Sequence, residues 1–94
     1  MNKFSVVMPL YFNENPVFFR EAVHSILNQT LIPDEVIIVV DGPVGYNLQT
    51  ELDIYSDNKQ IKIIWLKENR GIGFARKKGI EKASHNILAI MDSD

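Results

Sequence analysis

The chain has 94 residues, which is enough for one small domain and too few for two. Its formal net charge of -2 argues against a nucleic-acid-binding protein, which would usually carry a basic face. It has no cysteine, so a disulfide and a cysteine-ligated zinc site are both excluded. The sequence shows no signal-peptide pattern and no apolar stretch of the roughly 20 residues that a membrane span needs. These features favour a cytoplasmic protein without a transmembrane segment.

The first third of the chain predicts a strand followed by a helix. Residues 5–8 form a short apolar run that Pro9 is expected to end. Asn15 and Pro16 are typical of a helix start, with Asn as the capping residue and Pro at the first helical position. Apolar side chains then follow at helical spacing: Phe19, Ala22, Val23, Ile26 and Leu27.

The middle of the chain predicts a buried strand and a weaker helix. Residues 36–40 are all β-branched and apolar on both faces, which is typical of a central strand in a parallel sheet. Asp41-Gly42-Pro43 ends this strand with turn-forming residues. Leu48, Leu52 and Tyr55 indicate the second helix.

The last third predicts a third strand over residues 61–66, a third helix, and a fourth strand over residues 87–91. Trp65 and the pair Phe18-Phe19 are expected in the core. One face of the third helix is expected to carry Ile72, Ala75, Gly79, Ile80 and Ala83. The alternation of strands and helices predicts an α/β fold, with an open, mainly parallel sheet flanked by helices and Val6, Ile38, Ile64 and Leu88 on its central strands.

In open α/β sheets, ligands bind beyond the carboxyl ends of the strands, so the residues there are the candidates for function. Asp92-Ser93-Asp94 follows the fourth strand, and two carboxylates at this spacing can share a hard cation such as Mg²⁺ or Mn²⁺. The alternative is a solvated acidic turn. Asp41 can accept hydrogen bonds from a base or a ribose, or can simply form the turn before Gly42.

Residues 69–76 join the third strand to the third helix. Gly71 and Gly73 let the backbone approach a ligand, the helix start attracts anions, and Arg70 and Arg76 can neutralise phosphate. The segment also half-matches the dinucleotide-binding fingerprint, but Arg76 occupies the place of the last glycine, and the first strand would normally carry that motif.

Taken together, these segments resemble family 2 glycosyltransferases of the GT-A fold. The resemblance covers the whole chain and rests on five segments in order: residues 5–11, 25–30, 35–43, 69–76 and 92–94. Two positions depart from the usual pattern: Val40 replaces the first of two acidic residues, and Lys77 stands where many members have Asn.

The resemblance implies a role for each matching residue. Pro9, Leu10 and Tyr11 would line the base and ribose pocket, and Asp41 would contact the uracil or its equivalent. Arg70 and Gly71 would border the nucleotide. Asp92 would touch the ribose or the metal, and Asp94 would hold Mn²⁺ or Mg²⁺ between the phosphates.

The resemblance also implies what the whole protein does. It would transfer a sugar from a nucleotide-diphosphate sugar, with a UDP-sugar favoured, to a saccharide or lipid-linked acceptor hydroxyl with inversion. This would serve polysaccharide or glycolipid synthesis at the inner face of the membrane. Residues 1–94 would be a single truncated nucleotide-sugar-binding domain, with the catalytic base expected downstream. A cut sheet edge predicts marginal stability or self-association. Two alternatives remain: a non-catalytic nucleotide-binding module, and another doubly wound domain such as a dinucleotide-binding or receiver-like one.

Overall fold

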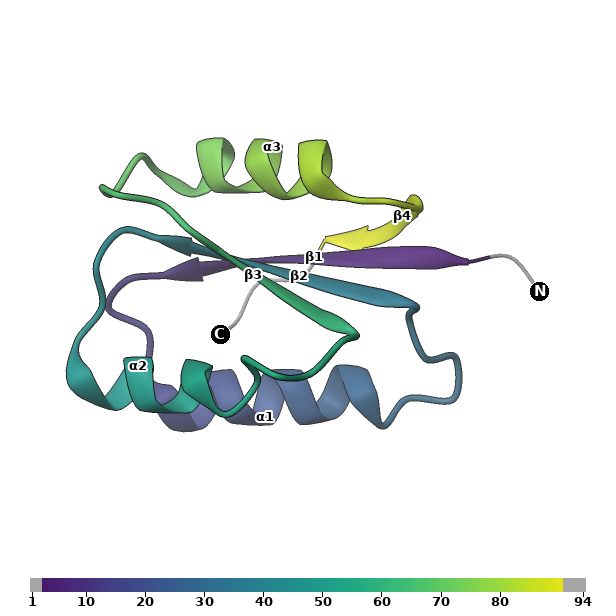
Figure 1. Ribbon diagram of the computed structural model, residues 1–94, viewed down its shortest axis with the longest axis horizontal. Helices are drawn as coiled ribbons and strands as arrows, with labels where there is room; N and C mark the ends of the chain where they lie inside the picture. The colour runs from purple at the N-terminus through teal and green to yellow at the C-terminus, as the bar shows by residue number, and fades with distance from the viewer. Residues whose placement is uncertain (1–2, 91–94) are drawn as a thin grey trace.

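The computed structural model describes residues 3–90 and shows one four-stranded sheet covered by helices on both faces (Figure 1). All its strand pairs are parallel, in the order β3-β2-β1-β4. This confirms the predicted α/β fold with an open parallel sheet. The elements in chain order are β1 (Phe4–Tyr11), α1 (Pro16–Leu27), β2 (Glu35–Asp41), α2 (Tyr46–Asp53), β3 (Ile61–Trp65), α3 (Ile72–Lys82) and β4 (Asn86–Ile90).

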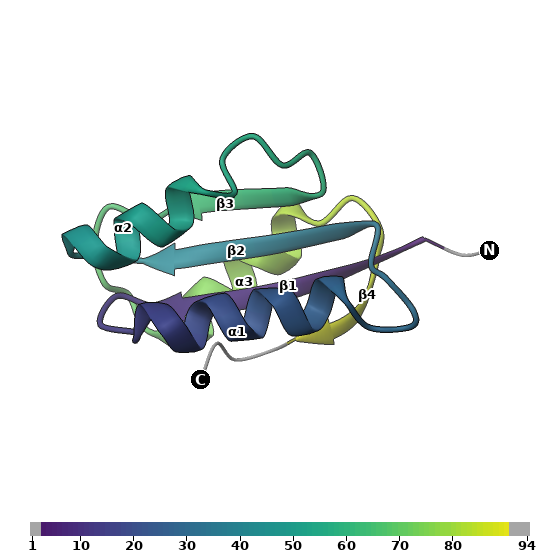
Figure 2. The same ribbon diagram turned by 90° about the horizontal axis from the view of Figure 1, so that it is seen from below.

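The helices form two unequal layers. α1 and α2 lie side by side on one face of the sheet, and α3 lies alone on the other (Figures 1 and 2). The larger hydrophobic cluster is between the sheet and the α1–α2 layer and includes Phe19, Leu52 and Tyr55. The smaller cluster under α3 has Ile37, Val39 and Ala75 at its centre. All connections between the strands therefore cross over one face or the other and return to the same end of the sheet.

β2 is the central strand that its composition predicts. All seven of its residues are buried, and it pairs with β1 on one side and with β3 on the other. β1 is longer than expected, because it continues through Pro9 to Tyr11. The prediction that Pro9 ends the strand is wrong. β4 pairs with β1 only as far as Val7. Within the described residues, therefore, no strand on the β4 side of β1 lies beside Pro9, and the backbone N–H group that proline lacks is not needed for a hydrogen bond there.

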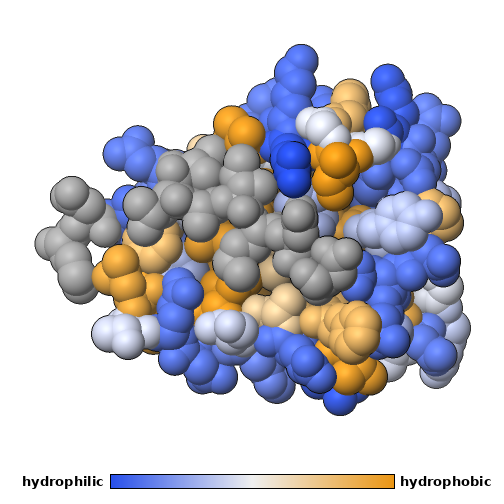
Figure 3. All heavy atoms as spheres, turned by 180° about the vertical axis from the view of Figure 1, so that it is seen from behind, coloured by the Kyte–Doolittle hydropathy of each residue, from blue (hydrophilic) through white to orange (hydrophobic). Residues whose placement is uncertain are grey.

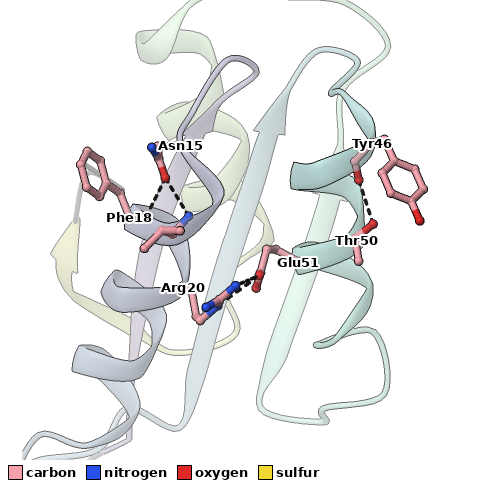
Figure 4. Close-up of polar contacts among 7 residues, drawn as sticks. Asn15, Phe18, Arg20, Tyr46, Thr50 and Glu51 are labelled. Atoms are coloured by element: carbon pink, nitrogen blue, oxygen red, sulfur yellow. Dashed lines mark hydrogen bonds and ion pairs between the residues drawn. The ribbon is translucent and has the colours of Figure 1, made fainter.

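α1 begins as its sequence indicates. The Asn15 side chain accepts hydrogen bonds from the backbone N–H groups of Val17 and Phe18, at 2.8 and 3.3 Å (Figure 4). Phe19 is fully buried, but Phe18 is 54% exposed, so only one of the two phenylalanines belongs to the core. Arg20 of α1 forms an ion pair with the largely buried Glu51 of α2 (Figure 4). This pair ties the two helices of the larger layer together.

Fewer residues of α3 are buried against the sheet than its apolar pattern predicts. Ala75 and Gly79 are buried against the sheet, whereas Ile72 and Ile80 are nearly half exposed. A Cβ atom on Gly79 would lie 2.4 Å from a methyl carbon of Val7, so the close approach of α3 to the sheet requires glycine here. One small-residue strip, not the whole predicted face, therefore makes the contact.

The edges of the sheet differ from the prediction in one respect. β3 and β4 are edge strands within the described residues, so Ile64 and Leu88 are not on central strands. Trp65, at the end of β3, is 47% exposed and does not lie in the core.

In the space-filling view, hydrophobic residues reach the surface in small patches among hydrophilic ones (Figure 3). Within residues 3–90, no helix combines the length and the apolar character that crossing a membrane requires.

Candidate functional site

The carboxyl ends of β1, β2 and β3 meet at one edge of the sheet, at the left of Figure 1. Tyr11 and Asp41, the last residues of β1 and β2, are paired in the register of the two strands. Beyond the end of β3, the Leu66 N–H group donates to the Val40 carbonyl oxygen at 3.0 Å. The chain then forms the loop of residues 67–71 and enters α3. The structure therefore brings together three of the segments that the sequence singled out.

Asp41 is the buried centre of this edge, with only 2% of its surface exposed. One of its carboxylate oxygens accepts the Arg70 N–H group at 2.8 Å, and the other accepts the Gly71 N–H group at 3.0 Å. The Asn69 side chain also accepts from Gly71, at 3.1 Å. Asp41 is thus a hydrogen-bonded anchor for the loop before α3, a role that sequence reasoning did not assign to it.

Two glycines make this arrangement sterically possible. Gly42 has φ 103°, and a Cβ atom there would lie 2.9 Å from the backbone nitrogen of Asn69. Gly71 has φ 95° and is the residue before α3, where no side chain caps the helix. The β2–α2 turn can therefore pack directly on the β3–α3 loop.

The Arg70 side chain lies at the surface beside α3. Its guanidinium carbon is 4.6 Å from the centre of the Phe74 ring, and the same ring has the Lys78 ammonium nitrogen 5.5 Å from its centre. The Arg70 guanidinium also forms a long ion pair with the Glu68 carboxylate, with 3.5 Å between Nη1 and Oε1. Phe74 lies in the segment 69–76 but was given no role of its own, although its spacing of four residues from Lys78 on α3 is a signal that could have found it.

The residues predicted to line the base pocket differ in accessibility. The Pro9 and Leu10 side chains are buried, and Leu10 packs in the larger hydrophobic cluster. The Tyr11 ring is about half exposed and contacts the Phe12 ring at a centroid distance of 4.6 Å. Of these three residues, only Tyr11 presents its side chain to solvent at this edge.

The predicted metal ligands Asp92 and Asp94 lie outside the described residues. Among residues 3–90, no group of three or more His, Cys, Asp or Glu side chains is arranged to hold a metal ion. β4 runs parallel to β1, with Ile90 paired to Val7, so its direction is toward the edge that carries Tyr11 and Asp41. The oxygen ligands of two aspartates suit Mg²⁺ or Mn²⁺.

Comparison with known proteins matches residues 5–94 to the model of a family described as glycosyl transferase family 2. The chain is 39% identical over 92 residues to an Escherichia coli UDP-Gal:alpha-D-GlcNAc-diphosphoundecaprenol beta-1,3-galactosyltransferase, covering 98% of this chain and 34% of that protein. It is 36% identical to the amylovoran biosynthesis glycosyltransferase AmsE of Erwinia amylovora, covering 97% and 34%. A crystal structure of S. aureus TarS superposes with a TM-score of 0.75 at 28% identity, covering 98% of this chain and 27% of that one. The chain spans about a third of the length of these curated relatives.

Proposed function

The chain belongs to glycosyl transferase family 2, and on this premise we propose that it binds the nucleotide of a nucleotide-diphosphate sugar, with a UDP-sugar favoured. The observation that carries the proposal is the position of Asp41. This carboxylate is buried at the carboxyl edge of the sheet, level with Tyr11 and directly beneath the Arg70–Gly71 backbone. Ligands of open α/β sheets bind at this edge.

Asp41 has two roles in this proposal. Each carboxylate oxygen accepts one N–H group from the loop, and each has a further lone pair that can accept from the nucleoside base. Tyr11 and the backbone of Pro9 and Leu10 border the base and ribose. Arg70 and the backbone of Gly71 face the phosphates, where the uncapped start of α3 also favours an anion.

We assign Asp92 and Asp94 to a Mn²⁺ or Mg²⁺ ion, with Asp92 also touching the ribose. The bound cation would neutralise charge on the diphosphate as it leaves. The residues of this chain bind and orient the donor, and none of them is assigned as the general base. Inversion needs such a base to deprotonate the acceptor hydroxyl, and we expect it in the part of the family's length that this chain does not span.

The names of the relatives favour a class of acceptor. The E. coli relative is a galactosyltransferase whose name includes a diphosphoundecaprenol-linked sugar, and the E. amylovora relative is named for the biosynthesis of amylovoran. We therefore propose a saccharide or lipid-linked acceptor, in polysaccharide or glycolipid synthesis at the cytoplasmic face of the membrane.

Titration of UDP into the wild type, Asp41→Ala and Asp94→Ala, each with Mn²⁺ and with chelator, tests this proposal. Asp41→Ala removes an acceptor and releases the Arg70–Gly71 backbone, so UDP binding should weaken with or without metal, by about 1–3 kcal/mol. Asp94→Ala removes a cation ligand, so its effect should appear only in the metal-dependent part of binding. Equal affinity in all six titrations, or a wild type that binds no nucleotide, would count against the proposed function.

A further inference from the structure

Two cationic side chains share one aromatic ring at α3. Phe74 and Lys78 are four residues apart on the same side of α3, and Arg70 lies in the loop two residues before the helix begins. Both cationic groups lie over the Phe74 ring, with the Arg70 guanidinium carbon at 4.6 Å and the Lys78 nitrogen at 5.5 Å from its centre. The Phe74 side chain is half-buried. One aromatic side chain therefore gathers two positive charges beside the candidate site.

The structure gives the Arg70 guanidinium little else to hold it. Its side chain is 51% exposed, and its ion-pair partner Glu68 is 73% exposed at a distance of 3.5 Å. Ion pairs between exposed side chains contribute little and are screened by salt. The backbone of Arg70 is fixed by Asp41, so the ring of Phe74 is what fixes the other end of the residue.

Stacking on a ring also leaves the guanidinium chemically available. A guanidinium that stacks flat on an aromatic ring keeps its N–H donors in its own plane, where they can bind phosphate oxygens in pairs. Arg70 and Lys78 are both positively charged and both lie over the Phe74 ring, so an anion bound close to them would be stabilised. A diphosphate has the charge and the geometry that this arrangement accepts.

We propose that Phe74 is a positioning residue that holds Arg70 against α3, with Lys78 beside it, so that the two cations meet the diphosphate of the nucleotide. This inference rests on the proposed function, because it presupposes a nucleotide at the carboxyl edge of the sheet. It assigns to Phe74 an effect on the phosphates and none on the nucleoside.

The experiment compares binding of UDP and of uridine, in chelator, to the wild type, Phe74→Leu and Phe74→Tyr. Phe74→Leu should raise the dissociation constant for UDP about two- to fivefold and leave that for uridine unchanged. Phe74→Tyr keeps an aromatic face and should bind UDP as the wild type does. Phe18→Leu is the matched control, because Phe18 is an exposed phenylalanine on α1 and, among residues 3–90, the cation–ring contacts of Arg70 and Lys78 are to Phe74. It should change neither constant.

A double variant shows whether Phe74 acts through Arg70. Once Arg70→Ala has removed the guanidinium, adding Phe74→Leu should weaken UDP binding only by the part that Lys78 contributes, which is less than its effect in the wild type. An equal loss for UDP and uridine would assign Phe74 a merely structural role and overturn the proposal. So would a Phe74→Leu variant that binds UDP as tightly as the wild type.

A wild type that binds no UDP would contradict the proposed function, and a second measurement then still tests the positioning role. Nitrogen-15 relaxation of the Arg70 Nε–H group reports how firmly the guanidinium is held in the free protein. Phe74→Leu should make this group more mobile, and Phe74→Tyr should not. Unchanged mobility in Phe74→Leu would overturn the proposal whether or not a nucleotide binds.

Discussion

The two ends of β2 each carry a buried carboxylate, and the two are satisfied in different ways. Glu35, the first residue of the strand, is 4% exposed and accepts from the Ser5 hydroxyl at 2.7 Å and the Ser84 N–H group at 2.9 Å, while Lys62 pairs with its other oxygen. Asp41, the last residue, accepts two backbone N–H groups of one loop, and within residues 3–90 the structure gives it no ion pair.

The difference separates a structural carboxylate from a candidate binding one. Burial acts to raise the pKa of Glu35, but the hydrogen bonds from Lys62, Ser84 and Ser5 together outweigh it and lower the pKa to about 2, from the usual 4.5. Its partners come from β1, β3 and the turn before β4, so Glu35 ties three strands together at the end of the sheet away from the site. Among residues 3–90, Asp41 has no cationic partner, and its two oxygens accept only backbone N–H groups of the loop before α3.

The largest expected effect is on stability at the Glu35 end. Glu35→Ala leaves the buried Ser5 hydroxyl and the Ser84 N–H group without their acceptor, and should lower the free energy of unfolding by about 3 kcal/mol. Urea denaturation measures this loss. Glu81→Ala, an exposed control on α3, should stay within about 0.5 kcal/mol of the wild type. A Glu35→Ala protein as stable as this control would show that the carboxylate is not a structural tie.

Acid should remove the same stabilisation without a mutation. Because the pKa of Glu35 is about 2 when folded and near 4.5 when unfolded, its contribution is fully present above pH 4.5 and is lost as the pH falls toward 2. Between pH 5 and pH 2, the wild type should lose up to about 3 kcal/mol more of its unfolding free energy than Glu35→Gln does. Parallel pH profiles for the two proteins would contradict the assignment.

The smallest effect on stability is expected at the other end of the strand. Asp41→Asn keeps one acceptor oxygen but replaces the other with an amide that cannot accept the second loop N–H group, and should cost about 1–2 kcal/mol. Nucleotide binding should suffer in this variant and stay intact in folded Glu35→Ala, as calorimetric titration with UDP can show. If Glu35→Ala lost nucleotide binding and Asp41→Asn kept it, Glu35 would be the binding carboxylate and Asp41 the structural one.

Much of the fold follows from local patterns in the sequence. The β-branched residues 36–40 form the buried central strand, and the Asn15-Pro16 pair begins α1 where predicted. The alternation of elements predicts the parallel sheet, because short right-handed crossovers leave few other arrangements. The match of residues 5–94 to the family model confirms the family that the ordered motifs indicated.

The errors arise where a local pattern does not show how far the sheet extends. Trp65 and Ile80 are apolar and correctly spaced, but among residues 3–90 β3 is an edge strand and α3 is the one helix on its face, and both side chains stay nearly half exposed. Phe18 is likewise turned out of the core, although it is chemically identical to its buried neighbour Phe19. Helical and strand periodicity predict which residues share a face, and they do not predict how wide the opposing surface is.

The sequence by itself determined the succession of strands and helices along the chain, the family, and the short list of polar residues at the carboxyl ends of the strands. Only the tertiary structure decided what those residues do to one another. Asp41 meets the Arg70 and Gly71 N–H groups 29 and 30 positions away, and Glu35 meets the Ser84 N–H group 49 positions away. The physical reason is that a hydrogen bond depends on distances of a few ångströms between atoms, which chain folding sets and local spacing does not.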